Sequence, residues 1–259
     1  MLFNSIHFLV FFFIVILIYF SIPNKYRWIL LLIASYYFYM TNGIQYAFLL
    51  MASTLVVYFT GLKMGKLRRK KQRKKYLILS LIFNLSILFV FKYFGFFSKF
   101  LNTILSNLSL PNTPIFNFLL PVGISFYTFQ ILSYSIQVYN GEIKSEKHFG
   151  IFALYAAFFP TILSGPIERA NHLIPQLYKK YVFNHDRVVT GLKIVLWGLF
   201  LKLVIANRMS ILVNAVYDNV LDFTGIPLII ATIFFAYQIY SDFAGYSLIA
   251  LARAVVLGF

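Results

Sequence analysis

The stretch from Pro227 to Phe259, PLIIATIFFAYQIYSDFAGYSLIALARAVVLGF, is apolar enough to cross a membrane, yet it carries the carboxylate of Asp242 in its middle. About 20 helical residues cross a bilayer core of roughly 30 Å. A carboxylate at that depth is costly, so it normally faces a bundle interior or a water-filled path. We therefore expect a transmembrane helix here, with a polar site around the carboxylate.

The whole chain shares this apolar character. Of its 259 residues, 61% are hydrophobic and only 12% are charged, whereas a soluble domain needs more charge to cover its surface. Apolar runs recur along nearly the full length, which predicts an all-α, polytopic transmembrane bundle forming a single domain over residues 1–259. The chain has no cysteine, which excludes disulfides, thiolate nucleophiles and cysteine–metal sites.

The charge is strongly basic and concentrated in one place. The net charge is +16, and nine of the 23 basic residues lie in KMGKLRRKKQRKK, from Lys63 to Lys75. The positive-inside rule makes this a cytoplasmic loop, which can also touch anionic lipid. No aromatic residue interleaves the charge, so nucleic-acid binding is not expected. The apolar run Ile6–Phe20 has no basic residue before it and no small-residue cleavage site after it, which favours a retained anchor.

The apolar runs predict eight membrane segments, at about residues 6–20, 28–40, 44–62, 76–97, 117–139, 151–164, 188–206 and 227–250. The segment 151–164 is too short to cross, and Pro160 and Gly165 break its end, so we expect a half-membrane or re-entrant element. Segment 28–40 is also short. If it crosses, three spans precede the cytoplasmic basic loop and Met1 is expected outside the cell; if it does not cross, Met1 is expected on the cytoplasmic side.

Two connecting segments have a distinct composition. Residues 98–116 are rich in Ser, Asn, Thr and Pro, which predicts an exposed loop on the outer face. Residues 167–182 alternate apolar and basic positions around Pro175, which is typical of a segment lying along the cytoplasmic headgroups.

Polar side chains interrupt the apolar segments in three places: Leu119–Gly141, Phe158–Arg169 and the Asp242 stretch. Gln130 and Gln137 are seven residues apart, so they share a helix face, which we expect to point inward. The Ser and Thr residues of the first stretch are typical of interhelical hydrogen bonding.

Two charged positions leave alternatives open. Glu168 beside Arg169 predicts either an ion pair at the membrane edge or a wall of a substrate path. Asp242 is either a structural carboxylate bonded to Tyr240 and Tyr246 or a functional one, and Gly245 permits close helix approach there.

Histidine is informative through its positions. His7 lies near the terminus, and His148, His172 and His185 lie in predicted loops, without a paired metal-ligand spacing. We therefore expect no metal site. No histidine lies deep in an apolar segment, so no residue is predicted to be the catalytic base of an acyl transfer to a hydroxyl.

The chain resembles the membrane-bound O-acyltransferase family, in particular the bacterial branch with the alginate O-acetyltransferase membrane subunit and the teichoic-acid D-alanyl transfer protein. The matching residues are PVGISFYTFQ from Pro121 to Gln130, then Tyr139, Gly141, Phe159-Pro160, Gly165-Pro166-Ile167, Arg169, Pro175-Gln176, Tyr240, DFAGYS from Asp242 to Ser247, and Leu257-Gly258-Phe259. The chain departs from the family pattern at Ala252, where glycine is usual, and at Val255, where a basic residue is common. The family's histidine taken as catalytic follows a Trp- and Arg-rich segment that has no match here, so we expect a truncated, N-terminal half.

The resemblance implies a funnel through a helical bundle in a bacterial inner or plasma membrane. A cytosolic acyl thioester, acetyl-CoA or an acyl carrier protein thioester, would donate an acyl group, in the first place acetyl, to hydroxyls of an exported polysaccharide or cell-wall polymer. No bound cofactor is implied, and an extracytoplasmic acyltransferase would be a partner. The residues that would line or support the funnel are Tyr127, Gln130, Glu168, Arg169, Asp242 and Tyr246.

Two other classes of function remain open. A membrane transporter also places polar residues on broken helices at mid-depth, often in two symmetric halves. No second copy of the Asp242 or Gly165-Pro166 pattern is present, which counts against it. A non-catalytic scaffold for cell-envelope enzymes is the third reading.

Overall fold

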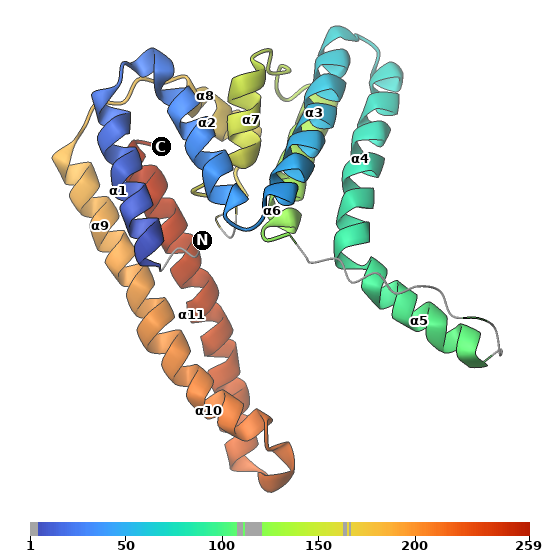
Figure 1. Ribbon diagram of the computed structural model, residues 1–259, viewed down its shortest axis with the longest axis vertical. Helices are drawn as coiled ribbons and strands as arrows, with labels where there is room; N and C mark the ends of the chain where they lie inside the picture. The colour runs from blue at the N-terminus through green and yellow to red at the C-terminus, as the bar shows by residue number, and fades with distance from the viewer. Residues whose placement is uncertain (1–4, 108–110, 112–120, 163–164, 166) are drawn as a thin grey trace. The chain divides into compact units, whose positions relative to one another are not determined.

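The computed structural model describes residues 5–107, 111, 121–162, 165 and 167–259, and it contains helices without any strand in these ranges (Figure 1). Of the described residues, 81% are helical, which confirms the predicted all-α class. Among the described residues, four helices are long and apolar enough to cross a membrane: Ile44–Lys66, Lys70–Lys92, His185–Tyr217 and Ile226–Leu257. The chain is therefore a membrane protein.

The chain divides into two compact units. One comprises Met1–Arg27, Ser164–Pro166 and Lys179–Phe259, and the other comprises Trp28–Leu163 and Ile167–Tyr178. Each unit has its own buried residues, and we describe them separately. The single transmembrane domain expected from the sequence stays a prediction.

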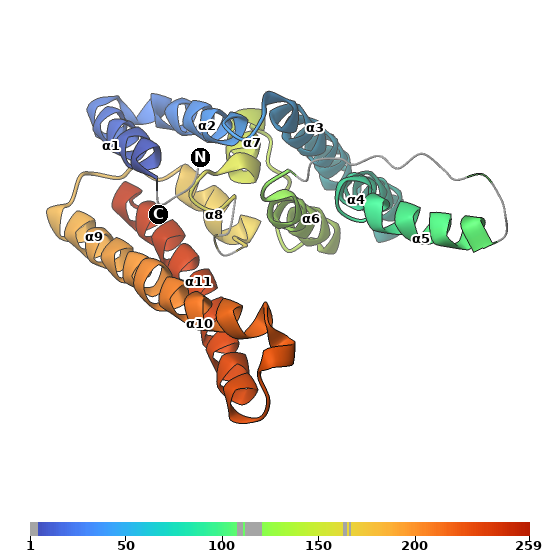
Figure 2. The same cartoon turned by 60° about the horizontal axis from the view of Figure 1, so that its bottom comes forward.

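The first unit contains α1 (Ile6–Ser21) and, much later in the chain, a long helical hairpin. Its first arm joins α9 (His185–Leu199), the π-helix η1 (Phe200–Ala206) and α10 (Asn207–Tyr217) without interruption, and a short 3-10 turn (Val220–Asp222) leads to α11 (Ile226–Leu257). Both views show this arm running alongside α11 (Figures 1 and 2). The predicted segment 188–206 ended too early, because residues 207–217 are partly polar but contain no proline or glycine to stop a helix.

Glycines let the two arms of the hairpin meet backbone to backbone. A Cβ added at Gly198 would lie 2.8 Å from the Gly245 carbonyl oxygen, and one added at Gly245 would lie 2.7 Å from the Gly198 carbonyl oxygen. Close approach at small residues is the usual way in which helices associate within a membrane. The close contact expected at Gly245 is thus confirmed.

The last helix ends in a glycine cap. Gly258 has φ +111°, in the left-handed region, and its N–H donates to the Ala254 carbonyl oxygen over 2.9 Å. Helices commonly end this way, because glycine has no Cβ to clash in that conformation. α11 therefore runs past the predicted end at about residue 250 and needs no polar residue to stop it.

In the second unit, α3 (Ile44–Lys66), α4 (Lys70–Lys92) and α6 (Ile124–Asn140) pack against one another, and the short helix α7 (Phe149–Ala157) packs against α3 and α6. It also holds α2 (Asn24–Met40), most of which belongs to this unit, α5 (Phe94–Asn107) and α8 (Ala170–Leu177). Every residue of α7 from Ile151 to Ala157 is buried. The Phe159 N–H that follows α7 donates to the Ser35 hydroxyl of α2 over 3.1 Å.

Three sequence predictions for this unit need correction. The basic run is mostly helical, because α3 continues to Lys66 and α4 begins at Lys70, and lysine and arginine are good helix formers. Residues 98–107 are not a loop but the second part of α5, whose apolar residues recur at helical spacing among the polar ones. α2 is longer than predicted, since it begins directly after Pro23.

The nine-residue α7 confirms that the 151–164 segment is too short to cross a membrane. It ends at Ala157, ahead of Pro160, and the turn that follows is buried. Irregular backbone at membrane depth requires such burial in protein. A re-entrant path for this segment stays a prediction, and its last residues, together with Pro166 and residues 117–120 of the preceding segment, lie outside the described residues.

Candidate functional site

The six predicted site residues fall into separate clusters. Tyr127, Gln130, Glu168 and Arg169 belong to the second unit, and Asp242 and Tyr246 belong to the first. Each cluster is described within its own unit.

Gln130 joins α6 to α7 through a reciprocal pair of hydrogen bonds. Its side-chain Nε2 donates to the Tyr155 carbonyl oxygen over 2.6 Å, and the Tyr155 hydroxyl donates back to the Gln130 carbonyl oxygen over 2.9 Å. The same hydroxyl contacts the carbonyl oxygen of Glu168 at 3.2 Å. Gln130 and Gln137 are both buried, which confirms that their shared face points inward. Gln130 therefore fixes the position of α7 against α6.

Tyr127 lies in a buried group of hydroxyls from three helices. Its ring meets that of Tyr39 on α2 edge to face, with centroids 6.1 Å apart, and Ser53 of α3 is close by. The three hydroxyl oxygens are buried, but the arrangement gives none of them a well-formed hydrogen bond. Such groups are costly in an apolar interior, so this cluster is the least satisfied part of the second unit.

Glu168 pairs with a histidine. Its Oε2 lies 3.0 Å from His172 Nδ1, one helical turn along α8, and the other ring nitrogen of His172 lies 2.9 Å from Gln176. Arg169 is exposed at the N-cap of α8, and no ion pair joins it to Glu168 in the part of the chain that the structure describes. Of the two alternatives for Glu168 and Arg169, the mutual ion pair is therefore wrong, because residues four apart face each other along a helix and adjacent ones do not, whereas the wall of a substrate path stays a prediction.

Asp242 forms an ion pair with a residue of the π-helix. Lys202 Nζ lies 2.5 Å from Asp242 Oδ1, with the lysine side chain 13% exposed and the carboxylate 50% exposed. The ring of Tyr246 lies beneath the same ammonium, 3.8 Å from Nζ to the ring centroid. Tyr240 is exposed, so the hydrogen bond expected from it to the carboxylate is wrong. The carboxylate of Asp242 is thus neutralised by a lysine on the neighbouring helix.

The ion pair forms because a glycine lets the two helices approach each other closely. A Cβ added at Gly245 would lie 3.1 Å from Lys202 Cβ, so the backbone of the π-helix approaches α11 only because residue 245 has no side chain. The π-helix adds an extra residue per turn around Lys202, and such turns occur frequently at functional sites. The close approach brings the ammonium within reach of a carboxylate on the neighbouring helix.

No protein-family model matches the chain. Curated proteins do match it: one of Pseudomonas aeruginosa, named "Probable alginate O-acetylase AlgI", is 34% identical over 266 residues, covering 100% of this chain and 50% of that protein. A peptidoglycan O-acetyltransferase of Helicobacter pylori is 29% identical over 242 residues, covering 83% of this chain and 45% of that protein. A teichoic acid D-alanyltransferase of Bacillus subtilis is 26% identical over 159 residues, 57% of this chain and 38% of that protein.

The chain belongs to the membrane-bound O-acyltransferase family. It spans about half the length of the curated relatives it matches. The resemblance carried by the polar stretches of the sequence is confirmed.

The sequence analysis did not single out three polar residues that the structure shows to be important: Lys202 and Tyr155 of these clusters, and the buried Arg253 of α11. Lys202 carried a signal, since it is a lysine inside a predicted apolar segment and so calls for an acidic partner. Arg253 carried the same signal; it is 1% exposed, donates from Nε to the Ile249 carbonyl oxygen over 2.8 Å and lies over the Phe8 ring. Tyr155 carried none, because a tyrosine in an apolar run is common.

The arrangement positions helices and neutralises charge. The ion pair, the Gln130–Tyr155 bonds and the glycine contact all hold neighbouring helices in register. The structure shows no group of three or more His, Asp or Glu side chains suited to a metal ion within its described ranges. His148 caps α7 through Nδ1, which accepts from the Ile151 N–H over 3.2 Å, and therefore has a structural role.

Proposed function

We propose that this chain forms part of an O-acyltransferase of the cell envelope, which moves an acetyl group to hydroxyls of an exported polysaccharide or cell-wall polymer. The observation that carries the proposal is the similarity over the full chain to a relative named for alginate O-acetylation. A second relative is named for O-acetylation of peptidoglycan. Two different acceptors with the same transferred group favour acetyl, and the D-alanyl relatives are less similar to this chain.

The donor in this proposal is a thioester on the cytosolic side, acetyl-CoA or an acyl carrier protein thioester. The protein is a multi-pass protein of the bacterial inner or plasma membrane, and an extracytoplasmic acyltransferase is its partner. Four helices suited to crossing a membrane support this placement. The basic run from Lys63 to Lys75 supports a cytosolic end for α3 and α4.

Within this proposal the polar clusters act as positioning groups. Lys202 and Asp242 neutralise each other between η1 and α11, and Gln130 is committed to the backbone of α7. Glu168 and Arg169, at the start of α8, and Tyr127 and Tyr246 remain proposed walls of the acyl path. We assign the catalytic base to none of these residues.

A chimera tests the proposal. Residues 1–259 are joined to the remaining part of the Pseudomonas aeruginosa relative and expressed in a strain that lacks that relative, and the O-acetyl content of its alginate is measured by NMR. We expect acetylation above that of the strain without the chimera. A chimera that inserts into the membrane normally but leaves the polymer unacetylated contradicts the proposal.

Two further measurements separate the alternatives. Polymer or solute flux through proteoliposomes without an acyl donor would favour a transporter. Normal acetylation by chimeras carrying Asp242→Ala and Gln130→Ala would favour a scaffold, because the polar clusters would then be dispensable.

A further inference from the structure

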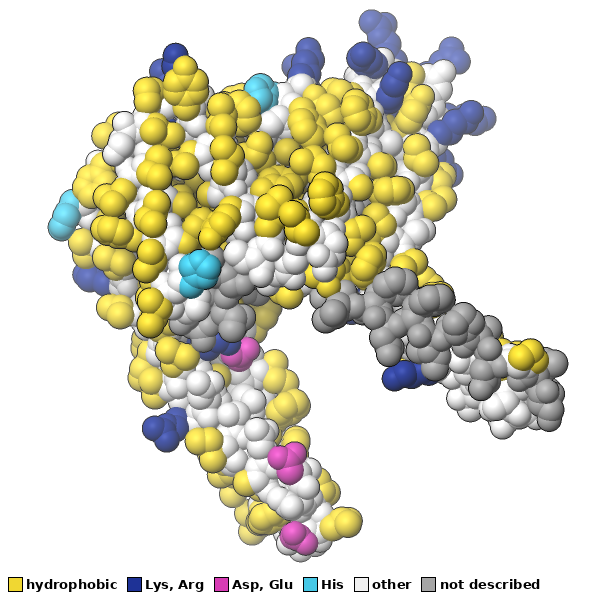
Figure 3. Space-filling model, viewed as in Figure 1, with side chains coloured by type: hydrophobic (Ala, Val, Ile, Leu, Met, Phe, Trp, Pro, Cys, Tyr) yellow, Lys and Arg dark blue, Asp and Glu magenta, His cyan; other side chains and the backbone are white. Residues whose placement is uncertain are grey.

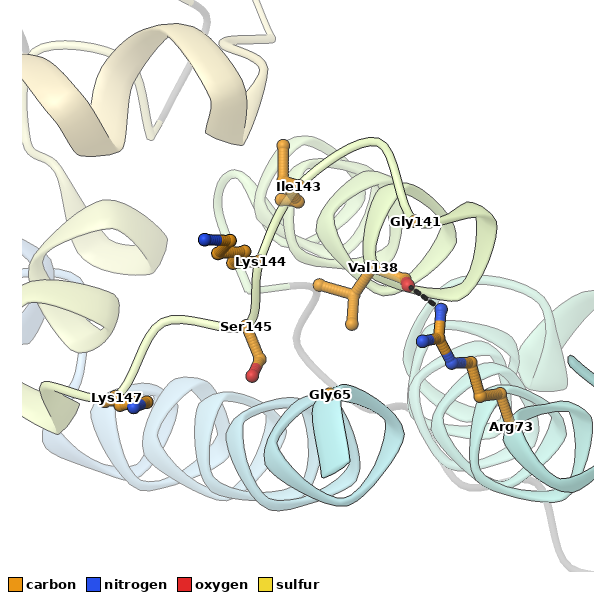
Figure 4. A pocket seen from close by; sticks show the side chains of 8 residues that line it. All are labelled: Gly65, Arg73, Val138, Gly141, Ile143, Lys144, Ser145 and Lys147. Carbon is orange, nitrogen blue, oxygen red and sulfur yellow. Dashed lines mark hydrogen bonds between the residues drawn. The ribbon is translucent and has the colours of Figure 1, made fainter. Parts of the chain in front are cut away.

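A cavity of about 330 Å³ lies in the second unit, where α3 and α6 end (Figure 4). Three cationic side chains line it, from Arg73, Lys144 and Lys147, together with the hydroxyl of Ser145 and two glycines. The predicted acyl path does not include this cavity.

The cavity has a defined wall because a loop crosses directly over α3. A Cβ added at Gly65 would lie 2.1 Å from Ser145 Oγ, so the loop after α6 rests against the α3 backbone at that point. The loop starts at Gly141, whose φ of +81° ends α6 in the left-handed conformation that glycine tolerates. Ser145, Lys144 and Lys147 are carried on this loop, as Figure 4 shows.

Arg73 is held in place by backbone oxygens. Its Nε donates to the Leu67 carbonyl oxygen over 2.8 Å, and its Nη1 lies 3.4 Å from the Val138 carbonyl oxygen. These carbonyls lie at the C-terminal ends of α3 and α6, where backbone oxygens lack helical partners and a cation is favourable. An arginine side chain has five N–H donors, so these two bonds fix the guanidinium and leave donors for a ligand.

The cations of the cavity have no acidic partner. In the part of the chain that the structure describes, neither Lys144 nor Lys147 forms an ion pair. The two carboxylates of the same loop are engaged elsewhere. Glu146 accepts from the His148 N–H over 2.7 Å and from the Tyr178 hydroxyl over 2.9 Å. Glu142 likewise accepts from an asparagine side chain at the end of α6.

The surrounding surface adds to the positive field. Lys and Arg side chains gather at the end of α3 and α4 that holds the cavity (Figure 3). The positive-inside rule explains a surplus of positive charge here. It does not explain why an arginine fixed by two helix ends, two lysines and a serine line the same cavity, where unpaired like charges repel.

We propose that this cavity binds a phosphoryl group. A phosphate presents several anionic oxygens, which suit a cavity lined by a fixed guanidinium, two lysines and a serine hydroxyl. A carboxylate has only two oxygens and one charge, and it would leave two of the cations unpaired. The phosphoryl group can be the phosphomonoester headgroup of phosphatidic acid or a soluble phosphate ester, since both reach the basic end of a membrane protein. This inference does not rest on the proposed acyl transfer.

The test uses the purified 259-residue chain in nanodiscs of phosphatidylcholine. Pyrophosphate is titrated by calorimetry as the soluble probe. Phosphatidic acid is included in the nanodiscs as the lipid probe, and its retention by the protein is measured by native mass spectrometry. The test variant is Lys144→Gln with Lys147→Gln, because both lysines are exposed.

The matched control is Lys71→Gln with Lys74→Gln. These two lysines belong to the basic run and are exposed, and they do not line the cavity, so the control loses the same charge. We expect the test variant to bind at least about tenfold more weakly, equivalent to about 1.4 kcal/mol, while the control binds like the parent chain. Arg73→Lys should weaken binding as well, because lysine cannot replace the fixed guanidinium.

The two probes identify the source of the phosphate. Retention of phosphatidic acid without binding of pyrophosphate assigns the cavity to a lipid headgroup, and binding of pyrophosphate assigns it to a soluble phosphate ester. Binding of neither probe overturns the proposal. An equal loss in the control variant also overturns it, because the attraction would then come from the basic run as a whole.

Discussion

The ion pair between Lys202 and Asp242 gives the sharpest prediction. Replacing Lys202 by methionine keeps the length of the side chain but leaves the carboxylate without its partner at membrane depth. Insertion scales put a charged residue at the centre of a membrane helix at about 2.5 to 3.5 kcal/mol. Asp242 is 50% exposed, so part of that cost is relieved by its surroundings. We therefore expect Lys202→Met to lower the free energy of unfolding by about 2 to 3 kcal/mol.

Replacing Asp242 instead of Lys202 should lower the free energy of unfolding by a smaller amount. In Asp242→Asn the ammonium of Lys202 keeps the face of the Tyr246 ring at 3.8 Å, and its long stem lets the charge move toward a polar surface. We expect a loss of about 1 to 2 kcal/mol for this variant. Removing both charges leaves neither group unpaired, so the double variant should lose less than about 1 kcal/mol.

The assay is a double-mutant cycle on the purified chain, unfolded from bicelles by sodium dodecyl sulfate and followed by circular dichroism. The expected result is strong coupling, with the double variant more stable than the sum of the two single losses predicts. Lys193→Met is the control, because this lysine is exposed on the same helical arm and forms no ion pair in the described structure. Additive losses, or a control as damaging as Lys202→Met, would refute the reasoning.

Three further changes test other contacts. Gly245→Ala places a Cβ 2.7 Å from a facing carbonyl oxygen and should cost about 1 to 3 kcal/mol, whereas Gly95→Ala, which meets nothing within 4 Å, should cost nothing; a comparison by thermal unfolding decides. Tyr155→Phe removes the hydroxyl that joins α6, α7 and the start of α8, and should cost about 1 kcal/mol in the same assay; an unchanged midpoint would show that the bonds are not needed. Partial burial and the hydrogen bond to Glu146 raise the pKa of Tyr178 to about 12 from 10.0, so its contribution to stability is present below pH 10.0 and is lost as pH rises toward about 12. The tyrosinate absorbance of the parent chain minus that of Tyr178→Phe should show this late titration, and a midpoint near 10.0 would contradict it.

Much of the helical pattern could be predicted from hydrophobicity alone. The first helix was expected at about residues 6–20 and is found at Ile6–Ser21, because a long apolar run with few polar residues leaves little choice. The inward face of Gln130 and Gln137 was also predictable, since helical spacing puts residues seven apart on one side. Mixed composition was misleading at α5, where polar residues on one face concealed a helix within a predicted loop.

Pairings between distant residues could not be predicted in the same way. The sequence shows a carboxylate at Asp242 and two neighbouring tyrosines, and a local interpretation joins them. The actual partner, Lys202, lies 40 residues earlier on another helix. Similarly, Glu168 pairs one helical turn along rather than with its neighbour, because the helix direction sets which side chains face each other.

The sequence by itself determined that this is a helical membrane protein, where its apolar helices lie, and which family its polar stretches resemble. Those properties follow from composition and local spacing, which every helix expresses on its own. Only the tertiary structure decided what neutralises Asp242, what Gln130 holds, and which cations share a cavity. These depend on how closely two backbones approach, and that distance is set by glycines such as Gly65 and Gly245 meeting a facing segment. The sequence shows where each glycine lies, but only the packed helices show which segment approaches its backbone.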